Sequence, residues 1–458
     1  MPLKPFIALL ALLVLLSGCA AIPKPTASLQ SGQEGELGRC ADFFSALDQR
    51  TRRSDALDAG LSKVAGYPYL RVDRFSASFS REVDGPRRFA AWLDRLQALD
   101  QGARRLEIAN LADAADQDDL KRQVVICGDL LKAADFQTPN RRAALRQEVS
   151  VPDEYIDLRR WVGLYPLTRW GVALGVSRWQ AEARDTLSLD PPPLDQERLR
   201  YLPAPGLSGP SAPEIMAGVR RDPLGIPILS SRDQQTLFQL YAPVWEVALE
   251  SDADPIGSPF WDAQGRLGVD TGRPRTYTRL SLTRFRQQIL IQLNYIIWFS
   301  ARPKSGPLDL YGGRLDGINL RITLDSSGLP LLYETVHNCG CYYHAFPTSR
   351  LQVADQIDYA EPPLVFKAPE IDAAQTYLTL SLAAGSHHVQ NIYGLTRQAG
   401  SPVLNYTLSG YDPLRSLPYR DDLRKSMFDV LGIAHGSERL ERFILWPMGV
   451  LSPGAMRQ

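Results

Sequence analysis

Two hairpin patterns in the second half of the chain constrain its fold more than any other feature. Ile318–Leu324 alternates apolar and polar residues, residues 325–328 (Asp-Ser-Ser-Gly) are typical of a turn, and Leu331–Val336 forms the returning segment. Tyr377–Leu382 and His388–Tyr393 repeat this arrangement around a second turn. We therefore expect an antiparallel sheet in this half of the protein.

The first half has a helical periodicity instead. Between Cys40 and about Asp190, apolar residues recur three or four positions apart, which predicts about five to seven helices. The predicted fold class is α+β, with a helical N-terminal domain followed by a mixed domain with antiparallel β-hairpins. Trp161–Val176 is apolar enough to suggest a membrane contact, but Pro166 and Arg169 interrupt it, so we expect a buried helix pair there.

Three further segments of the second half have a regular pattern. Gln235–Leu249 predicts an amphipathic helix that is kinked or restarted at Pro243. Tyr277–Arg286 alternates as a strand does, and the apolar residues of Ile289–Ile297 return to helical spacing.

The first residues resemble an export signal. Lys4 precedes the apolar run Phe6–Leu16, and Leu16-Ser17-Gly18-Cys19 places small residues just before a cysteine. The run is shorter than the roughly 20 residues needed to span a membrane. This leader is similar to that of bacterial lipoprotein precursors. The resemblance implies cleavage before Cys19 and acylation of Cys19, palmitate included; Ala20 rather than Asp implies the outer membrane, on its periplasmic side.

Composition shifts divide the chain further. Residues 20 to about 36 are rich in Pro, Ser, Gly and Gln and predict a flexible tether, and the Pro-rich stretch around 191–213 marks a connection. We expect a signal peptide at 1–18, the acylated Cys and tether at 19–37, a helical domain at 38–200, a Pro/Gly-rich connection at 201–234 and an α+β domain at 235–458.

The numbers of basic and acidic residues indicate which partners the protein can bind. Lys and Arg total 51 and Asp and Glu total 51, so no global charge favours nucleic acid. The expected partners are the membrane, through the N-terminal lipid, and an envelope component or protein. Arg284 and Arg286 would share a strand face and are candidates for binding an anion, although a solvated, salt-bridged face is the simpler explanation.

Four cysteines remain after Cys19. Cys40 and Cys127 both lie in helical-looking sequence, so we expect a disulfide between them, with two buried thiols as the alternative.

The segment from His337 to His344 carries the best candidate site. If the strand continues beyond Val336, His337, Cys339 and Cys341 point to one side, with His344 or His387 as a fourth ligand. Imidazole and thiolate suit zinc or copper. With three protein ligands the metal could support hydrolysis by a bound water, and with four it would be structural.

Two other interpretations of this segment stay open. In the first, Cys339 and Cys341 form disulfides in a non-catalytic envelope interaction protein. In the second, one of them is the nucleophile of a thiol-dependent enzyme, activated by His337, His344 or His387 and oriented by Glu334 or Asn338. The common motifs of metalloproteases, esterases, NTPases and dinucleotide-binding proteins are absent from the sequence, and no catalytic residue is assigned.

Overall fold

The protein is described by a computed structural model. The structure describes residues 28–437, apart from 33, 113–115, 152–164, 188–196, 207–208, 305, 307–308, 310, 355–362, 398–402 and 431. Its elements are helices and one large mixed sheet, which confirms the α+β fold class.

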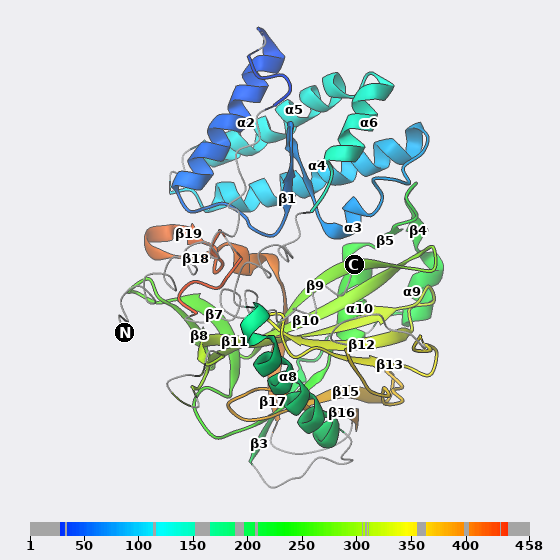
Figure 1. Ribbon diagram of the computed structural model, residues 1–458, viewed down its shortest axis with the longest axis vertical. Coiled ribbons are helices and arrows are strands. Elements are labelled where there is room, and N and C mark those ends of the chain that lie inside the picture. Colours follow the sequence, from blue (N-terminus) through cyan, green and yellow to red (C-terminus); the bar gives the residue numbers. More distant parts are fainter. Residues whose placement is uncertain are drawn as a thin grey trace.

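The helices of the first third of the chain gather at one end of the molecule (Figure 1). They are α2 (Glu36–Arg53), α3 (Arg74–Ala77), α4 (Pro86–Ala109), α5 (Gln117–Asp135) and α6 (Pro139–Glu148), with a hairpin of β1 (Ser62–Val64) and β2 (Tyr67–Val72) among them. Their apolar faces enclose Phe44, Trp92 and Leu131, all fully buried. A disulfide between Cys40 and Cys127 joins α2 to α5, which confirms that predicted pair.

Ionised side chains also fill this region. Arg71 and Arg104 are fully buried. Asp100 accepts hydrogen bonds from both, at 3.1 Å from Arg71 Nε and 2.8 Å from Arg104 Nε. Glu107 Oε1 accepts a hydrogen bond from Arg71 Nη2 at 2.7 Å. Asp48 Oδ1 accepts one from Arg104 Nη1 at 2.9 Å. The periodicity of the sequence did not predict this network, since charged residues normally face solvent.

A large sheet lies below these helices in Figure 1. Its path runs β14-β13-β12-β11-β10-β9-β17-β3-β6-β15-β16, with β7 paired to β10 and to β8. These strands are β3 (Arg198–Pro203), β6 (Val244–Ala248), β7 (Ile256–Trp261), β8 (Leu267–Asp270), β9 (Arg275–Phe285), β10 (Gln288–Arg302), β11 (Gly313–Leu324), β12 (Pro330–His337), β13 (His344–Pro347), β14 (Leu364–Val365), β15 (Thr376–Leu382), β16 (Val389–Thr396) and β17 (Val403–Gly410).

Further elements complete this part of the protein. They are α8 (Tyr165–Leu187), α9 (Ala212–Gly218), α10 (Ser231–Leu240), β4 (Arg220–Arg221), β5 (Pro227–Ile228), β18 (Leu417–Pro418), β19 (Arg424–Lys425) and the 3₁₀ turns η2 (Asp412–Arg415) and η3 (Arg420–Asp422).

Both predicted hairpins are present. β11 and β12 pair antiparallel, with Ile318 opposite His337, and β15 pairs antiparallel with β16. The strand predicted at Tyr277–Arg286 is β9. The sheet is mixed rather than purely antiparallel, because β13–β14, β15–β6, β17–β3 and β17–β9 run parallel.

One helix prediction in this half was wrong, and another was correct only in its first part. Ile289–Ile297 lies in β10, a strand of 15 residues with a long stretch in which consecutive residues are all buried. Such a strand is apolar on both faces, so its residues show no alternation and can match helical spacing by chance. The predicted helix Gln235–Leu249 ends with α10 at Leu240, and its second half is the buried strand β6.

Helix α8 packs against β16 rather than in a buried helix pair. Trp170 is 73% exposed and Leu174 is 54% exposed. The expectation of a buried pair is therefore not met for the described part of Trp161–Val176. Among the described helices, none combines the length and apolarity that crossing a membrane requires.

The helical end and the sheet share packing contacts. Ile289 of β10 and Leu224 and Ile226, between β4 and β5, belong to the apolar core of the helices. Within the segment expected to be a tether, Ser28 and Gln30 are buried, and Leu29 donates a backbone hydrogen bond to Gly66.

Candidate functional site

The segment with the candidate ligands is the turn that joins β12 to β13. β12 ends at His337, so the extended conformation does not continue through Cys341. The turn is closed by two backbone hydrogen bonds, from Gly340 N–H to His337 O at 2.7 Å and from His337 N–H to Cys341 O at 3.0 Å. Gly340 has a φ of 86°, which glycine adopts without steric cost. Cys339 and Cys341 are thiols on this turn, and each is partly exposed.

Close approach of the neighbouring strands fixes the turn in place. Asn338 N–H donates to Gly317 O at 2.8 Å, and Asn338 Nδ2 lies 3.4 Å from Ile297 O. A Cβ on Gly317 would overlap both Asn338 Nδ2 and Ile297 O. Only glycine at position 317 lets the turn pack against β10 and β11 in this way.

His387 is held between two buried carboxylates. Its imidazole is fully buried and stacks on Phe299, with ring centroids 3.7 Å apart and an interplanar angle of 2°. Nδ1 lies 2.8 Å from Asp316 Oδ2, and Nε2 lies 3.4 Å from Asp254 Oδ1. Phe299 and Asp316 are opposite each other in the β10–β11 pairing, so the sheet register sets this geometry.

The two carboxylates favour the charged form of His387. Burial opposes that charge, but the contacts with Asp254 and Asp316 and their negative charges outweigh burial and raise the pKa of His387. Burial also acts to raise the pKa of Asp254, but His387 and the backbone N–H groups of Gly385, Glu250 and Ser251 lower it overall. Asp254, His387 and Asp316 therefore form a compensated ionic cluster.

Asp316 also faces the candidate ligand His337. Its second oxygen, Oδ1, lies 3.6 Å from His337 Nδ1, and both side chains are almost completely buried. The centroid of the His337 ring lies 5.0 Å from that of Tyr342 and 5.6 Å from that of His388. His337 thus lies between the Asp316–His387 pair and a second group of aromatic rings.

His344 and His388 belong to that second group, which packs around Trp179 of α8. The Trp179 ring centroid lies 5.6 Å from His344 and 6.5 Å from His388. His344 Nδ1 is 3.1 Å from Thr335 Oγ1, whereas the buried Nε2 atoms of His344 and His388 have no hydrogen-bond partner in the described structure. Buried nitrogens of this kind call for a ligand, such as an ion or a water molecule.

Both imidazoles are neutral at physiological pH. Burial, together with the electrostatic interaction with His337, lowers the pKa of His344 to about 3. Burial, followed by electrostatic interactions with His337 and Arg302, lowers the pKa of His388 to about 2. A neutral imidazole is the form that binds a metal ion.

Tyr342 lies at the centre of these rings. Its ring centroid is 4.3 Å from that of His388 and 5.2 Å from that of Trp179, and Arg302 lies over its face at 5.3 Å. Its φ of 56° is unusual for a residue other than glycine, and burial raises its pKa. The turn therefore places Tyr342, the residue after Cys341, against the imidazoles.

The predicted ligands are brought near one another but not into one coordination shell. Among the residues that the structure describes, no three His, Cys, Asp or Glu side chains are arranged to hold a metal ion. Of the five candidates, His337, Cys339, Cys341 and His344 lie at the ends of or within one turn, while His387 is engaged by Asp254 and Asp316.

The other predicted roles have different outcomes. Glu334 accepts a hydrogen bond from Tyr343 Oη at 2.7 Å, and Asn338 faces Ile297, so both proposed orienting residues are engaged outside the imidazoles. Arg284 pairs with Glu82 at 2.5 Å and lies over Phe79, so it joins the sheet to the helices. β9 ends at Phe285, and Arg286 lies in the following turn, off the strand face.

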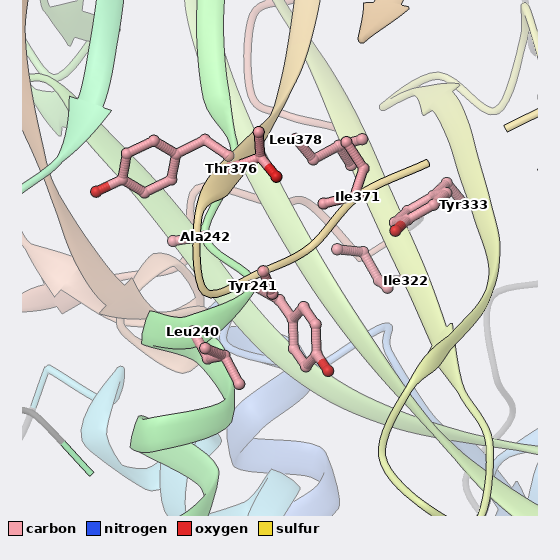
Figure 2. Close-up of a pocket in the computed structure, with 10 residues that line it drawn as sticks. Leu240, Tyr241, Ala242, Ile322, Tyr333, Ile371, Thr376 and Leu378 are labelled. Atoms are coloured by element: carbon pink, nitrogen blue, oxygen red, sulfur yellow. The ribbon is translucent and has the colours of Figure 1, made fainter. Parts of the chain in front are cut away.

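A small apolar pocket lies elsewhere in the sheet region. Figure 2 shows Tyr241, Ile322, Tyr333 and Leu378 around it. The side chains that line it are apolar or carry a hydroxyl group, and none of them is charged. We assign no chemistry to this pocket.

The comparisons identify no relative. No family model, curated protein or solved structure matches the chain. Several residues of the site had no role predicted from the sequence, among them Trp179, Asp254, Asp316, Tyr342 and His388. Asp316 had the clearest signal, as a carboxylate just before the alternating strand of the first hairpin, but nothing in the sequence indicated that His387 would meet it.

Proposed function

We propose that this protein is a lipid-anchored envelope protein, held at the periplasmic face of the outer membrane by Cys19, that binds copper(I) through Cys339 and Cys341. The lipid anchor rests on the leader sequence alone. The copper site rests on one structural observation. Two partly exposed thiols occupy a single closed turn, beside neutral imidazoles whose Nε2 atoms make no hydrogen bond in the described structure.

Copper(I) fits this arrangement better than zinc does. Zinc in proteins is almost always held by at least three side chains at one point, and the described residues contain no such group. Copper(I) favours soft thiolate ligands and accepts low coordination numbers, so two thiolates from one turn provide most of the binding. A hydrolytic zinc site is correspondingly disfavoured, and we propose binding of the ion rather than catalysis.

The oxidising compartment is compatible with this proposal because the structural disulfide is separate from the site. The disulfide joins Cys40 to Cys127 in the helical end of the protein. It stabilises the fold and does not involve Cys339 or Cys341. Bound copper(I) would in turn protect the two thiolates from oxidation, since a coordinated thiolate is a poorer nucleophile.

The test is an anaerobic titration of the full chain carrying Cys19→Ser, purified in detergent, against a chromophoric copper(I) chelator with ascorbate present. We expect about one copper(I) per chain and loss of that binding in Cys339→Ser/Cys341→Ser. His435→Ala is the matched control, because His435 packs against Trp261 rather than in the site. Equal binding by the serine double variant, or no binding by the parent chain, would contradict the copper site.

The same preparations test the main alternative. An envelope interaction protein without a metal site would show no bound copper and two fully oxidised cysteines at 339 and 341. The anchor is tested separately in cells, where Cys19→Ser is expected to abolish incorporation of labelled palmitate and to release the protein from the membrane fraction.

A further inference from the structure

Two short hairpins at one edge of the sheet expose arginine and apolar side chains. The first is the β9–β10 pair, in which Phe285 lies opposite Gln288 where the hairpin closes. The second is the β4–β5 pair, in which Arg220 lies opposite Ile228. Both reach the right-hand edge of the molecule in Figure 1, and β5 contacts β10. Their exposed side chains, which we call the hairpin rim, are Arg220, Arg221, Ile228, Phe285 and Arg286.

The turn between β9 and β10 presents a cation and an aromatic ring together. Arg286 and Gln287 form this turn, with φ values of 48° and 65°. A two-residue turn of this kind usually has the sequence Asn-Gly, because larger side chains are strained in the left-handed region. The Arg286 guanidinium lies over the Phe285 ring, 5.4 Å from the ring centroid.

Hydrogen bonds and apolar contacts hold the β4–β5 hairpin beside this turn. Arg221 Nη1 donates to Gly225 O at 2.8 Å and to Ile289 O, on β10, at 3.3 Å. Leu224 and Ile226, in the turn between β4 and β5, belong to the apolar core of the helices. Because β10 and this core both hold the β4–β5 hairpin, the two hairpin ends keep their relative position.

The positive charge of the hairpin rim is not balanced by neighbouring carboxylates. Among the described residues, none forms an ion pair with Arg220, Arg221 or Arg286. Asp222 follows two of these arginines, but its carboxylate accepts hydrogen bonds from backbone N–H groups of its own turn. The sequence has no Asp or Glu at all in residues 271–308, which include the whole β9–β10 hairpin. The hairpin rim therefore attracts anions.

Apolar side chains lie among these cations. Ile228 is 54% exposed and Phe285 is 40% exposed. A soluble anion would meet the guanidinium groups alone and would leave both apolar side chains in water. A bilayer with anionic headgroups accommodates both kinds of side chain, because the headgroups attract arginine and the boundary with the acyl chains accepts apolar groups.

We infer that the hairpin rim docks directly onto an anionic phospholipid surface. Arg220, Arg221 and Arg286 lie at the headgroups, where their long side chains keep the charge in water, and Ile228 and Phe285 enter the boundary beneath them. This contact is separate from the proposed lipid anchor and the proposed copper site, and it requires neither of them.

Hydrogen–deuterium exchange of the full chain on vesicles tests where the protein meets the bilayer. The chain is reconstituted with vesicles of phosphatidylcholine alone and with vesicles of phosphatidylcholine and phosphatidylglycerol in equal parts. We expect slower amide exchange of residues 220–228 and 285–288 on the vesicles that contain phosphatidylglycerol, because docking excludes water from the hairpin rim. Equal exchange of these segments on the two kinds of vesicle would overturn the inference.

Substitutions test the charged and apolar groups separately. The readout is the ratio of the affinity for phosphatidylglycerol-containing vesicles to the affinity for phosphatidylcholine vesicles, measured by co-sedimentation of chains that carry Cys19→Ser. Arg286→Gln should lower this ratio about fivefold, and Arg220→Gln/Arg286→Gln should lower it further, since each cation near an anionic surface contributes a similar amount. Phe285→Ser should weaken binding to the phosphatidylglycerol-containing vesicles about tenfold.

Arg273→Gln and Phe260→Ser are the matched controls. Both residues are exposed, but Phe260 lies in β7 and Arg273 follows β8, on the opposite side of the sheet from the hairpin rim in Figure 1. These two substitutions should leave the ratio unchanged. Near-ultraviolet circular dichroism identifies any variant that fails to fold. A ratio that Arg220→Gln/Arg286→Gln does not lower would contradict the inference.

Two other occupants of the hairpin rim give different results. Release from the vesicles by inorganic phosphate, but not by sodium chloride of equal ionic strength, would assign the hairpin rim to a soluble anion. A dimer in sedimentation velocity that Phe285→Ser abolishes would assign it to a second copy of the chain. Either result overturns docking on a bilayer. None of these measurements uses copper(I), and the exchange experiment compares vesicles that hold the same chain, so a failure here leaves the proposed function standing.

Discussion

Arg415 forms an ion pair with Asp58, although the two residues lie 357 positions apart in the chain, with Arg415 Nε 2.9 Å from Asp58 Oδ1. Asp58 belongs to the loop before the β1–β2 hairpin and Arg415 to η2, beyond the last strand of the sheet. Both side chains are largely buried. The pair therefore ties the helical end of the molecule to the segment that follows the sheet.

Arg415→Ala should lower the free energy of unfolding by about 3 kcal/mol, because it leaves the buried Asp58 carboxylate without its main partner. Urea denaturation measures this. In a double-mutant cycle, adding Asp58→Ala to Arg415→Ala should cost much less than Asp58→Ala alone costs the parent. Additive costs would mean that the pair contributes no coupling.

Asp48 should make the helical end sensitive to acid. Burial acts to raise the pKa of Asp48, but the charges of Arg104 and Lys63 outweigh it and lower the pKa below 3.8. A carboxyl group whose pKa is lower in the folded state stabilises the fold above the unfolded value and loses this effect as the pH falls through the folded value. Thermal unfolding measured from pH 6 downwards, to about pH 2, should therefore show a shallower loss of stability in Asp48→Asn than in the parent chain.

Asp48→Asn will also be less stable than the parent at neutral pH, so the comparison concerns slopes rather than absolute values. Asp118→Asn is the control, since Asp118 is exposed and pairs with its neighbour Lys121 on α5. Parallel curves for Asp48→Asn and the parent would contradict this prediction.

Gly317→Ala should destabilise the protein by about 1–3 kcal/mol, since its Cβ would collide with Asn338 and with the backbone of Ile297. Gly102→Ala is the matched control. Gly102 lies within α4, and a Cβ added there would meet nothing within 4 Å, so alanine should stabilise this helix by up to about 1 kcal/mol. The two substitutions should shift the melting temperature in opposite directions.

His387→Ala should cost about 3–5 kcal/mol in the metal-free protein, because the buried carboxylates of Asp254 and Asp316 lose the cation between them. Calorimetry of the full chain measures the change. Replacing both carboxylates by Asn in the same variant should recover part of the stability. No recovery would indicate that the stacking on Phe299, rather than charge compensation, dominates the cost.

Cys40→Ala/Cys127→Ala should lower the free energy of unfolding by about 2–5 kcal/mol, because the disulfide closes a long loop that the unfolded chain otherwise samples freely. The parent chain unfolded with and without a reductant should show a difference of similar size. Cys339→Ser/Cys341→Ser, in contrast, should leave the unfolding of the metal-free protein almost unchanged.

Local patterns in the sequence predicted the parts of the fold that depend on neighbouring residues. The hairpin β11–β12 was predictable because alternation and a turn sequence coincide within one short segment. β10 was not, since Ile289–Ile297 is buried on both faces and its residue spacing carries no strand signal. The pair Cys40–Cys127 was predictable from the number and distribution of the cysteines.

The site was predictable only in part, for a related reason. His337, Cys339, Cys341 and His344 are close in sequence, and so a turn brings them close in space. Asp316 and His387 are distant in sequence, and they meet only because β11 and the second hairpin are brought together. Trp179 lies on α8, beyond the segment that the sequence predicted as a buried helix pair, and nothing in the sequence placed it beside His344. Such contacts depend on strand order, which no local pattern encodes.

If Cys19 anchors the protein as proposed, the burial of Ser28 and Gln30 limits how far the folded body can lie from the membrane. Gln30 hydrogen bonds to Asp135 at the end of α5, so the folded body holds the chain from there on. With Cys19 acylated, the residues between it and Ser28 reach at most about 30 Å when fully extended. The proposed anchor would then be attached to the helical end of the protein through this short segment.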